Sequence, residues 1–222
     1  MKTKQAGFTL VEIAIVLVII GLLLGGILKG QEMIIQAKVK NSIQDFSGVS
    51  AAYFGYQDRY RAIPGDDIGA DRWTSPSTAT KGNGDRVLSG KYNCAAAAGC
   101  VTTDTVETAL WWDHLRRSGF ITGGTGVTNP QNAFNGILGV QQGDGAGGVA
   151  GVLGGFTNVV LCSTNLPDKV AIALDVQMDD GLQGSGAVRG QQNAGNVAIV
   201  TTAAVSSYQE TGTLAYTLCR QF

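Results

Sequence analysis

The chain has few of the residues on which common catalytic and metal sites depend. Among 222 residues there is one histidine, His114, and no Cys-x-x-Cys pair, so zinc binding by the cysteines is a poor alternative to disulfides. No Gly-Lys-Ser/Thr phosphate loop occurs, and a serine or cysteine nucleophile would need His114 as its base. His114 lies among Asp113, Arg116 and Arg117, which favours an exposed charged helix face. We therefore expect no enzymatic activity and no cofactor.

Charge is also scarce. Only 15% of the residues are charged and the net charge is -1, so the chain has no strongly basic surface for nucleic acid. Glycine is abundant instead, at 32 residues, which predicts long, turn-rich connections. The segment 145–150 formally matches a dinucleotide-binding fingerprint, but neither a strand before it nor a capped helix after it is indicated, so we reject that interpretation.

One long apolar run, Phe8 to Leu28, stands out. At about 1.5 Å per residue, a helix of this length crosses the roughly 30 Å hydrocarbon core of a bilayer. Its one charge is Glu12, and an unpaired carboxylate inside a bilayer costs several kcal/mol. Because Lys2 and Lys4 precede the run, the positive-inside tendency places the N-terminus in the cytoplasm and the rest of the chain outside.

The apolar run differs from a secretory signal peptide. No small-x-small site follows Leu28, and the run is too long for a signal-peptide apolar region, so we expect it to stay in the mature protein. Cleavage after Gly7 would instead expose a new α-amino group on Phe8. That amine is four residues from Glu12 and thus on the same face of a helix, which would provide the missing cation.

The segment Gly7-Phe8-Thr9-Leu10-Val11-Glu12 resembles the processing motif of type IV prepilins. The resemblance implies cleavage between Gly7 and Phe8 by prepilin peptidase and N-methylation of Phe8. It further implies that the Glu12 carboxylate meets the Phe8 amine of a neighbouring subunit during filament assembly. The implied partners are the peptidase and methylase, a pilus assembly platform and further copies of the chain. The implied location is the bacterial inner membrane before assembly and an extracellular pilus afterwards.

Helical periodicity continues past the apolar run. No proline occurs from Gly30 to Tyr60, and apolar residues recur at spacings of three, four and seven, which predicts an amphipathic half packed on the globular domain. One helix from Phe8 to Tyr60 follows, and Pro64 ends it. The stripe consists of Ile34, Ile35, Val39, Ile43, Phe46, Val49, Tyr53, Tyr56 and Tyr60. Glycines in the middle of this helix predict either a local kink or close helix packing; they are Gly21, Gly25, Gly26 and Gly30.

The remainder reads as loops followed by strands. We expect a helix from Thr103 to Ser118 without a single apolar stripe, wedged between two surfaces. Segments rich in β-branched and aromatic residues predict four antiparallel strands: Thr157–Cys162, Lys169–Val176, Asn196–Thr202 and Thr213–Cys219. The resulting fold is α+β, the pilin fold. Its expected divisions are a leader at 1–7, a transmembrane half of the helix at 8–29, and a head at 30–222 that contains a loop region at 64–155 and the sheet at 156–222.

Four cysteines all follow the apolar run, in the part of the chain expected in an oxidising compartment, and they permit three pairings. We favour Cys94 with Cys100, which closes a short loop, and Cys162 with Cys219, which ties the last strand to the sheet. The second pairing resembles the disulfide that bounds the C-terminal region of pilins.

Oxygen ligands for calcium cluster weakly after the long helix. They are Asp66, Asp67, Asp71, Asn83 and Asp85. Their spacing differs from that of an EF-hand, so solvated turns are the better interpretation and no metal is predicted. Pro64–Asp66, Gly82–Asp85 and Glu107 also resemble a loop pattern of some prepilin-type proteins.

These features predict a structural subunit of a type IV pilus filament that polymerises through its N-terminal helix. Alternatives are a minor pilin, a type II secretion pseudopilin, or a membrane-tethered binding protein that never polymerises. The two expected disulfides and the long loop region favour a pilus over a secretion pseudopilus.

Overall fold

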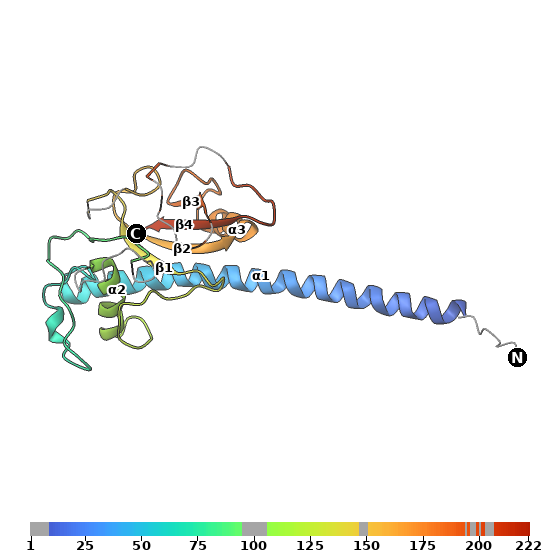
Figure 1. The fold of residues 1–222 in the computed structure, drawn as a ribbon, viewed down its shortest axis with the longest axis horizontal. Helices are drawn as coiled ribbons and strands as arrows, with labels where there is room; N and C mark the ends of the chain where they lie inside the picture. Colours follow the sequence, from blue (N-terminus) through green and yellow to red (C-terminus); the bar gives the residue numbers. More distant parts are fainter. Residues whose placement is uncertain are drawn as a thin grey trace, which may run out of the picture. The chain divides into compact units, whose positions relative to one another are not determined.

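A computed structural model describes residues 9–94, 106–146, 151–193, 195, 199, 201–202 and 207–222 (Figure 1). The chain divides into two compact units, Met1–Lys38 and Val39–Phe222. In order, the elements are α1, a short 3-10 helix at Ala70–Arg72, α2, β1, β2, α3, β3 and β4.

Helix α1 runs without interruption from Leu10 to Tyr60, a length of 51 residues. The four mid-helix glycines do not interrupt the helix. The helix ends where Arg61 adopts a left-handed conformation (φ 55°), followed two residues later by the Ile63-Pro64 turn.

The buried face of α1 begins at Val39. Phe46 and Tyr56 are fully buried, and Val49 and Tyr53 nearly so, at the three- and four-residue spacing that the sequence predicts. Ile34 and Ile35, by contrast, are 59% and 44% exposed. The expectation that these two residues belong to the buried stripe was therefore wrong, because the packed part of α1 starts one turn later.

The sheet has four antiparallel strands in the order β1-β2-β4-β3. Their bounds are Leu138–Gln142, Val159–Pro167, Val188–Gln192 and Ala215–Gln221 for β1 to β4. Cys162 of β2 lies opposite Cys219 of β4, and the two form a disulfide. The α+β class, the four-stranded antiparallel sheet and this cysteine pair agree with the sequence expectations. Cys100 lies outside the described residues, so its pairing with Cys94 stays a prediction.

One expected strand is a helix. Residues Lys169–Val176 belong to α3, which runs from Asp168 to Met178. A short apolar run does not by itself distinguish a buried strand from a buried helix, and here Val170, Ala171, Leu174 and Asp175 are buried with helical spacing. Asp168 accepts the backbone N–H groups of Thr211 and Gly212, and these contacts hold the start of α3.

Two strands were not expected. β1 lies within the segment predicted as loop, and β3 precedes the segment Asn196–Thr202 that was predicted as a strand. Of that segment the structure describes residues 199, 201 and 202, and none of the three lies in a strand. β1 and β3 each contain a glycine, which weakens a strand signal. In β1 the glycine is required, because a Cβ on Gly139 would collide with the carbonyl of Tyr92.

Helix α2, Glu107–Arg117, packs against the last part of α1 and against β1, and it shares one core cluster with them. Eight of its 11 residues are buried, including Trp111 and Trp112 on different faces. Trp111 stacks on Tyr53 of α1 with ring centroids 5.0 Å apart. The predicted helix between two surfaces is thus present, although residues 103–105 of the predicted range lie outside the described part.

Removing the β2–β4 disulfide should destabilise the folded chain. The bond joins residues 57 apart in sequence, and the chain-entropy model gives about 4 kcal/mol for a loop of that size. We expect the free energy of unfolding of a Cys162→Ala, Cys219→Ala variant to fall by about that amount. Urea unfolding of the detergent-solubilised protein, followed by tryptophan fluorescence, measures it, and an unchanged midpoint would contradict the prediction.

Candidate functional site in the N-terminal helix

The first half of α1 presents its apolar side chains on all sides. From Leu10 to Leu28 each large aliphatic residue is at least 46% exposed, and Leu10 is 86% exposed. Among the described residues this is the one helix long and apolar enough to cross a membrane. Exposure of so much apolar surface to water is unfavourable by about 25 cal/mol per Å². The segment is therefore suited to lipid or to packing against other helices.

Glu12 is the one acidic residue in this segment, and its side chain takes part in capping the N-terminus of α1. Its Oε2 accepts the backbone N–H of Thr9 at 2.8 Å and the Thr9 hydroxyl at 2.7 Å. The Glu12 N–H in turn lies 3.3 Å from the Thr9 hydroxyl oxygen. This reciprocal arrangement is a capping box, which satisfies donors that a helix start leaves free. Thr9 thus supplies hydrogen bonds to the Glu12 carboxylate, but it does not neutralise the negative charge of that carboxylate.

Gly7 and Phe8 lie outside the described residues. The predicted cleavage between them and the predicted meeting of the Phe8 amine with Glu12 therefore stay predictions. At the other end of the apolar segment, Lys29 and Glu32 form an exposed ion pair at 2.7 Å. An exposed pair at i, i+3 contributes little to stability, but it marks the point at which charged side chains resume.

Four small positions leave room along the segment. A Cβ built on Gly21, Gly25, Gly26 or Gly30 would meet no atom within 4 Å. Within this chain, then, none of these glycines is required by a close contact. Small residues let apolar helices approach closely in a membrane or in a bundle, so these positions fit contacts with other helices.

The weak calcium candidates separate into two groups. Asp66 and Asp85 come together with Glu107, their carboxylate oxygens lying within 4.8 Å of one another. Asp66 accepts the N–H groups of Gly84 and Arg86, and Glu107 accepts those of Asn83 and Ser89. The loop 83–89 is thus fastened to two buried carboxylates. Burial raises the pKa of Asp66 and of Glu107 against the opposing effect of these hydrogen bonds.

Two other calcium candidates, Asp67 and Asp71, form ion pairs with basic side chains of this chain. Asp67 accepts the Tyr56 hydroxyl at 2.6 Å and forms an ion pair with Arg72 at 2.7 Å. Burial acts to raise the pKa of Asp67, but the hydrogen bonds from Arg72, Tyr56 and Gly69 outweigh it and lower that pKa. Asp71 pairs with Lys81 at 3.3 Å.

The Asn83 side-chain amide donates a hydrogen bond to the Asp85 carboxylate, with Nδ2 and Oδ2 3.0 Å apart. Glu107, the third member of the acidic group, was not among the calcium candidates. Its spacing from Asp66 in sequence gives no signal of their contact, although Glu107 is part of the loop pattern noted in the sequence.

His114 is buried, not exposed as the sequence suggested. Its Nδ1 accepts the N–H of Gly65 at 2.9 Å, so Nε2 carries the proton and donates to the Thr80 carbonyl at 2.8 Å. Both ring nitrogens therefore join α2 to the segment that precedes it, at Gly65 and at Thr80. Two charged neighbours of His114 pair with each other, since Asp113 and Arg117 form a buried ion pair at 2.6 Å. A satisfied, buried imidazole of this kind holds structure together.

The motif in this segment is also found in other proteins. Residues 2–28 match the family model of the prokaryotic N-terminal methylation motif, the type IV prepilin signature. No curated protein was found to match the chain. The chain thus carries the prepilin signature, which supports a type IV pilin-like or pseudopilin protein of structural character. The motif implies processing by prepilin peptidase and polymerisation, and with the apolar helix it fits a protein anchored in a membrane before assembly.

The buried state of His114 can be tested by its titration. Burial lowers its pKa, outweighing the hydrogen bond to Thr80 and the charges of Asp67 and Asp113, which raise it. In the unfolded chain the His114 imidazole has a pKa of about 6.5. Its contribution to stability is therefore full above that pH and is lost as the pH falls toward the folded pKa. We expect the imidazole proton resonances of this one histidine to titrate below pH ~6.5 in the folded protein.

NMR of the folded protein in detergent micelles makes the measurement, with urea-unfolded protein as the control. A folded-state midpoint at or above that of the unfolded chain would contradict the buried, neutral ring.

Proposed function

We propose that the protein is the structural subunit of a type IV pilus filament, cleaved between Gly7 and Phe8, methylated on Phe8 and polymerised through α1. The observation that carries this proposal is the exposed apolar half of α1 with a single carboxylate, Glu12, at its start. Such a helix is suited to insertion in a bilayer as a monomer and to packing among copies of itself in a fibre.

The energetics explain why the carboxylate matters. Transfer of the apolar segment from lipid to a bundle of like helices gains little hydrophobic energy, because lipid is already apolar. Close packing at the glycines supplies attraction without a defined register. A charged pair between Glu12 and the Phe8 amine of a neighbour would be strongly distance-dependent in such a medium and would fix that register.

The proposed divisions of the chain follow from this role. Residues 1–7 are the leader, 8–29 the membrane and assembly half of the helix, and 30–222 the head. The partners are prepilin peptidase and methylase, an assembly platform with its motor, and further copies of the chain. The head lies outside the cytoplasm, where the Cys162–Cys219 disulfide would form. We propose no catalytic role, no cofactor and no nucleic-acid partner.

The disulfide in the head and the long segment between α1 and β1, which contains α2, support a pilus subunit over the main subunit of a secretion pseudopilus. A major pilin would be abundant in fibres, whereas a minor pilin would occur there only in traces. Mass spectrometry of sheared surface filaments distinguishes these roles. We expect abundant peptides that begin with N-methylated Phe8.

Replacing Glu12 by alanine should separate insertion from assembly. We expect Glu12→Ala to leave membrane insertion and leader cleavage intact, because the apolar run is unchanged, and to reduce the yield of filaments strongly. The measurement compares sheared filaments with the cellular pool of cleaved protein by immunoblot. Glu32→Ala is the matched control, since it removes a carboxylate from the same helix beyond the apolar segment and should assemble normally. Normal filament yield from Glu12→Ala would refute the assembly role of this residue.

A further inference from the structure

The head contains a cavity beside the end of α1 that the proposed function does not use. It has a volume of about 500 Å³ and is lined by Gln57, Arg61, Ala62, Ile63, Asp66, Ile68, Gly84 and Arg86. A second hollow of about 260 Å³ shares Ile63 and Arg86 with it and adds Phe54, which is 54% exposed. We call the two together the arginine cavity. Its lining is mixed, with aliphatic and aromatic side chains beside polar and charged ones, and Ile68 is 64% exposed.

Arg61 and Arg86 give this cavity a positive charge. Within the described residues neither guanidinium group has a hydrogen-bond or ion-pair partner in this chain. The one carboxylate in the lining belongs to Asp66, which is 3% exposed and already accepts two backbone N–H groups. The cavity therefore presents two unpaired guanidinium groups in a lining that also contains Ile63 and Ile68, which fits a carboxylate with an aliphatic neighbour.

Both arginines occupy backbone positions that favour other residues. Their φ angles are 55° at Arg61 and 67° at Arg86, in the left-handed region. Glycine or asparagine is preferred at the end of a helix such as α1, where Arg61 stands. The fold itself thus gives no reason for an arginine at position 61.

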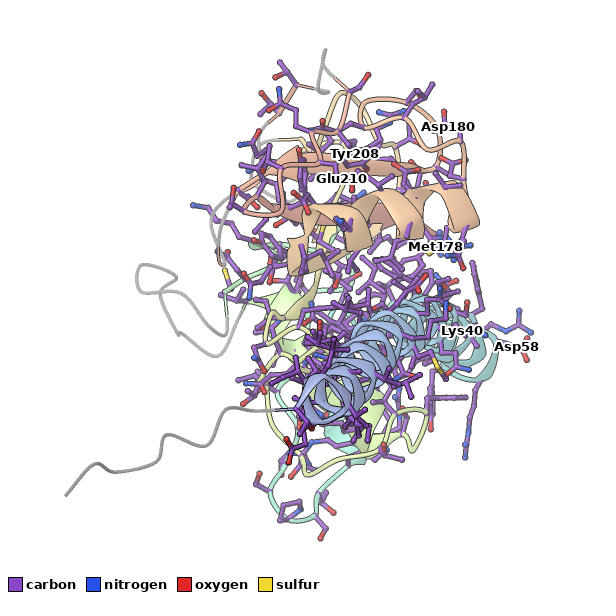
Figure 2. The ribbon with its side chains drawn as sticks, turned by 90° about the vertical axis from the view of Figure 1, so that its right-hand side faces the viewer. Lys40, Asp58, Met178, Asp180, Tyr208 and Glu210 are labelled. Carbon is purple, nitrogen blue, oxygen red and sulfur yellow. A yellow bond between two sulfur atoms is a disulfide. The ribbon has the colours of Figure 1, made fainter. Side chains whose placement is uncertain are left out.

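The complementary surface consists of the last turn of α3 and the turn that follows it, residues 176–187, which we call the acidic turn. There Val176 and Leu182 are 61% and 55% exposed, and Asp180 is exposed between them in sequence. The turn folds back on the helix, since a Cβ on Gly181 would lie 2.8 Å from Cγ2 of Val176. Figure 2 shows Asp180 at the outer edge of the molecule, above Met178.

Hydrogen bonds hold the acidic turn in one shape. Asp180 accepts the N–H of Leu182 at 2.8 Å and the Ser185 hydroxyl at 2.7 Å, and Asp175 accepts the N–H of Gly181 at 3.1 Å. Each Asp180 oxygen keeps a further lone pair for an arginine. A rigid turn of this kind loses little entropy on docking.

We propose that the acidic turn of one copy docks in the arginine cavity of the next, with Asp180 facing Arg61 and Arg86 and with Leu182 against the aliphatic side chains of the lining. The two surfaces differ, and α3 and the end of α1 lie near opposite ends of the sheet (Figure 1). A contact between unlike surfaces repeats from copy to copy and generates a helical assembly when it does not close. The inference rests on the proposed filament function and names the contact between heads within it.

A charge exchange tests the contact in the full-length protein in cells. Arg61→Glu and Asp180→Arg should each lower the yield of filaments about tenfold or more, because like charges would then face each other across the interface. The combined variant should restore the yield, since every copy carries both changes. Arg59→Glu and Asp58→Arg are matched controls, because they make the same charge changes on α1 outside the cavity lining and should assemble normally.

A further variant excludes a folding defect. Arg61→Gly suits the left-handed backbone, so we expect thermal stability of the detergent-solubilised protein equal to or above that of the wild type, together with a reduced filament yield. Normal yield from Arg61→Glu, or failure of the combined variant to recover, would overturn the contact.

The readouts also separate this contact from the filament function itself. Wild-type protein that never enters fibres would refute the proposed function, whereas wild-type fibres with indifferent Arg61 and Asp180 variants would refute the contact alone.

Discussion

One constraint governs this molecule: half of a 51-residue helix is apolar on every side and is not covered by the chain that carries it. In water this surface would be strongly unfavourable, so the segment requires lipid or other helices. Glu12 adds a second requirement. Thr9 satisfies its hydrogen bonds, but within the described residues no cation stands beside it. Both requirements point outside the single chain, one to an apolar surrounding and the other to a positive charge.

The other half of α1 is the element on which the head is built. Phe46, Tyr53 and Tyr56 lie in one core cluster with α2, β1 and β2. The loop that follows α1 is fixed to this cluster by polar contacts, in which Tyr56 binds Asp67 and His114 binds Gly65. In the described residues 61–94 the one regular element is a short 3-10 helix, and hydrogen bonds to buried carboxylates and to one imidazole hold this segment to the core. The single histidine thus serves packing, where sequence alone suggested an exposed charge.

Periodicity and local motifs predict the parts of this structure that depend on neighbours in sequence. The long helix, the helix containing Trp111 and Trp112, and the last strand are of this kind. Lys169–Val176 was mistaken for a strand because its burial pattern depends on what packs around it. The contact between Asp66 and Glu107 could not be predicted either, because it depends on the conformation of a loop for which the sequence indicates only turns. The charge of Glu12 was evident from sequence, whereas its capping contact needed coordinates.

Under the proposed function, assembly would depend on polar contacts for its specificity. The apolar segment is cohesive in any rotation or shift, so it cannot by itself select one helical arrangement. A charge pair at the start of α1 would fix the axial position of neighbouring helices. A second pair between heads, if made by Arg61, Arg86 and Asp180, would fix their rotation about the fibre axis. Two separated contacts of this kind constrain a helical lattice more fully than either contact alone. An apolar helix that tolerates many arrangements can then yield a single fibre, because specificity comes from the charged groups and cohesion from the rest.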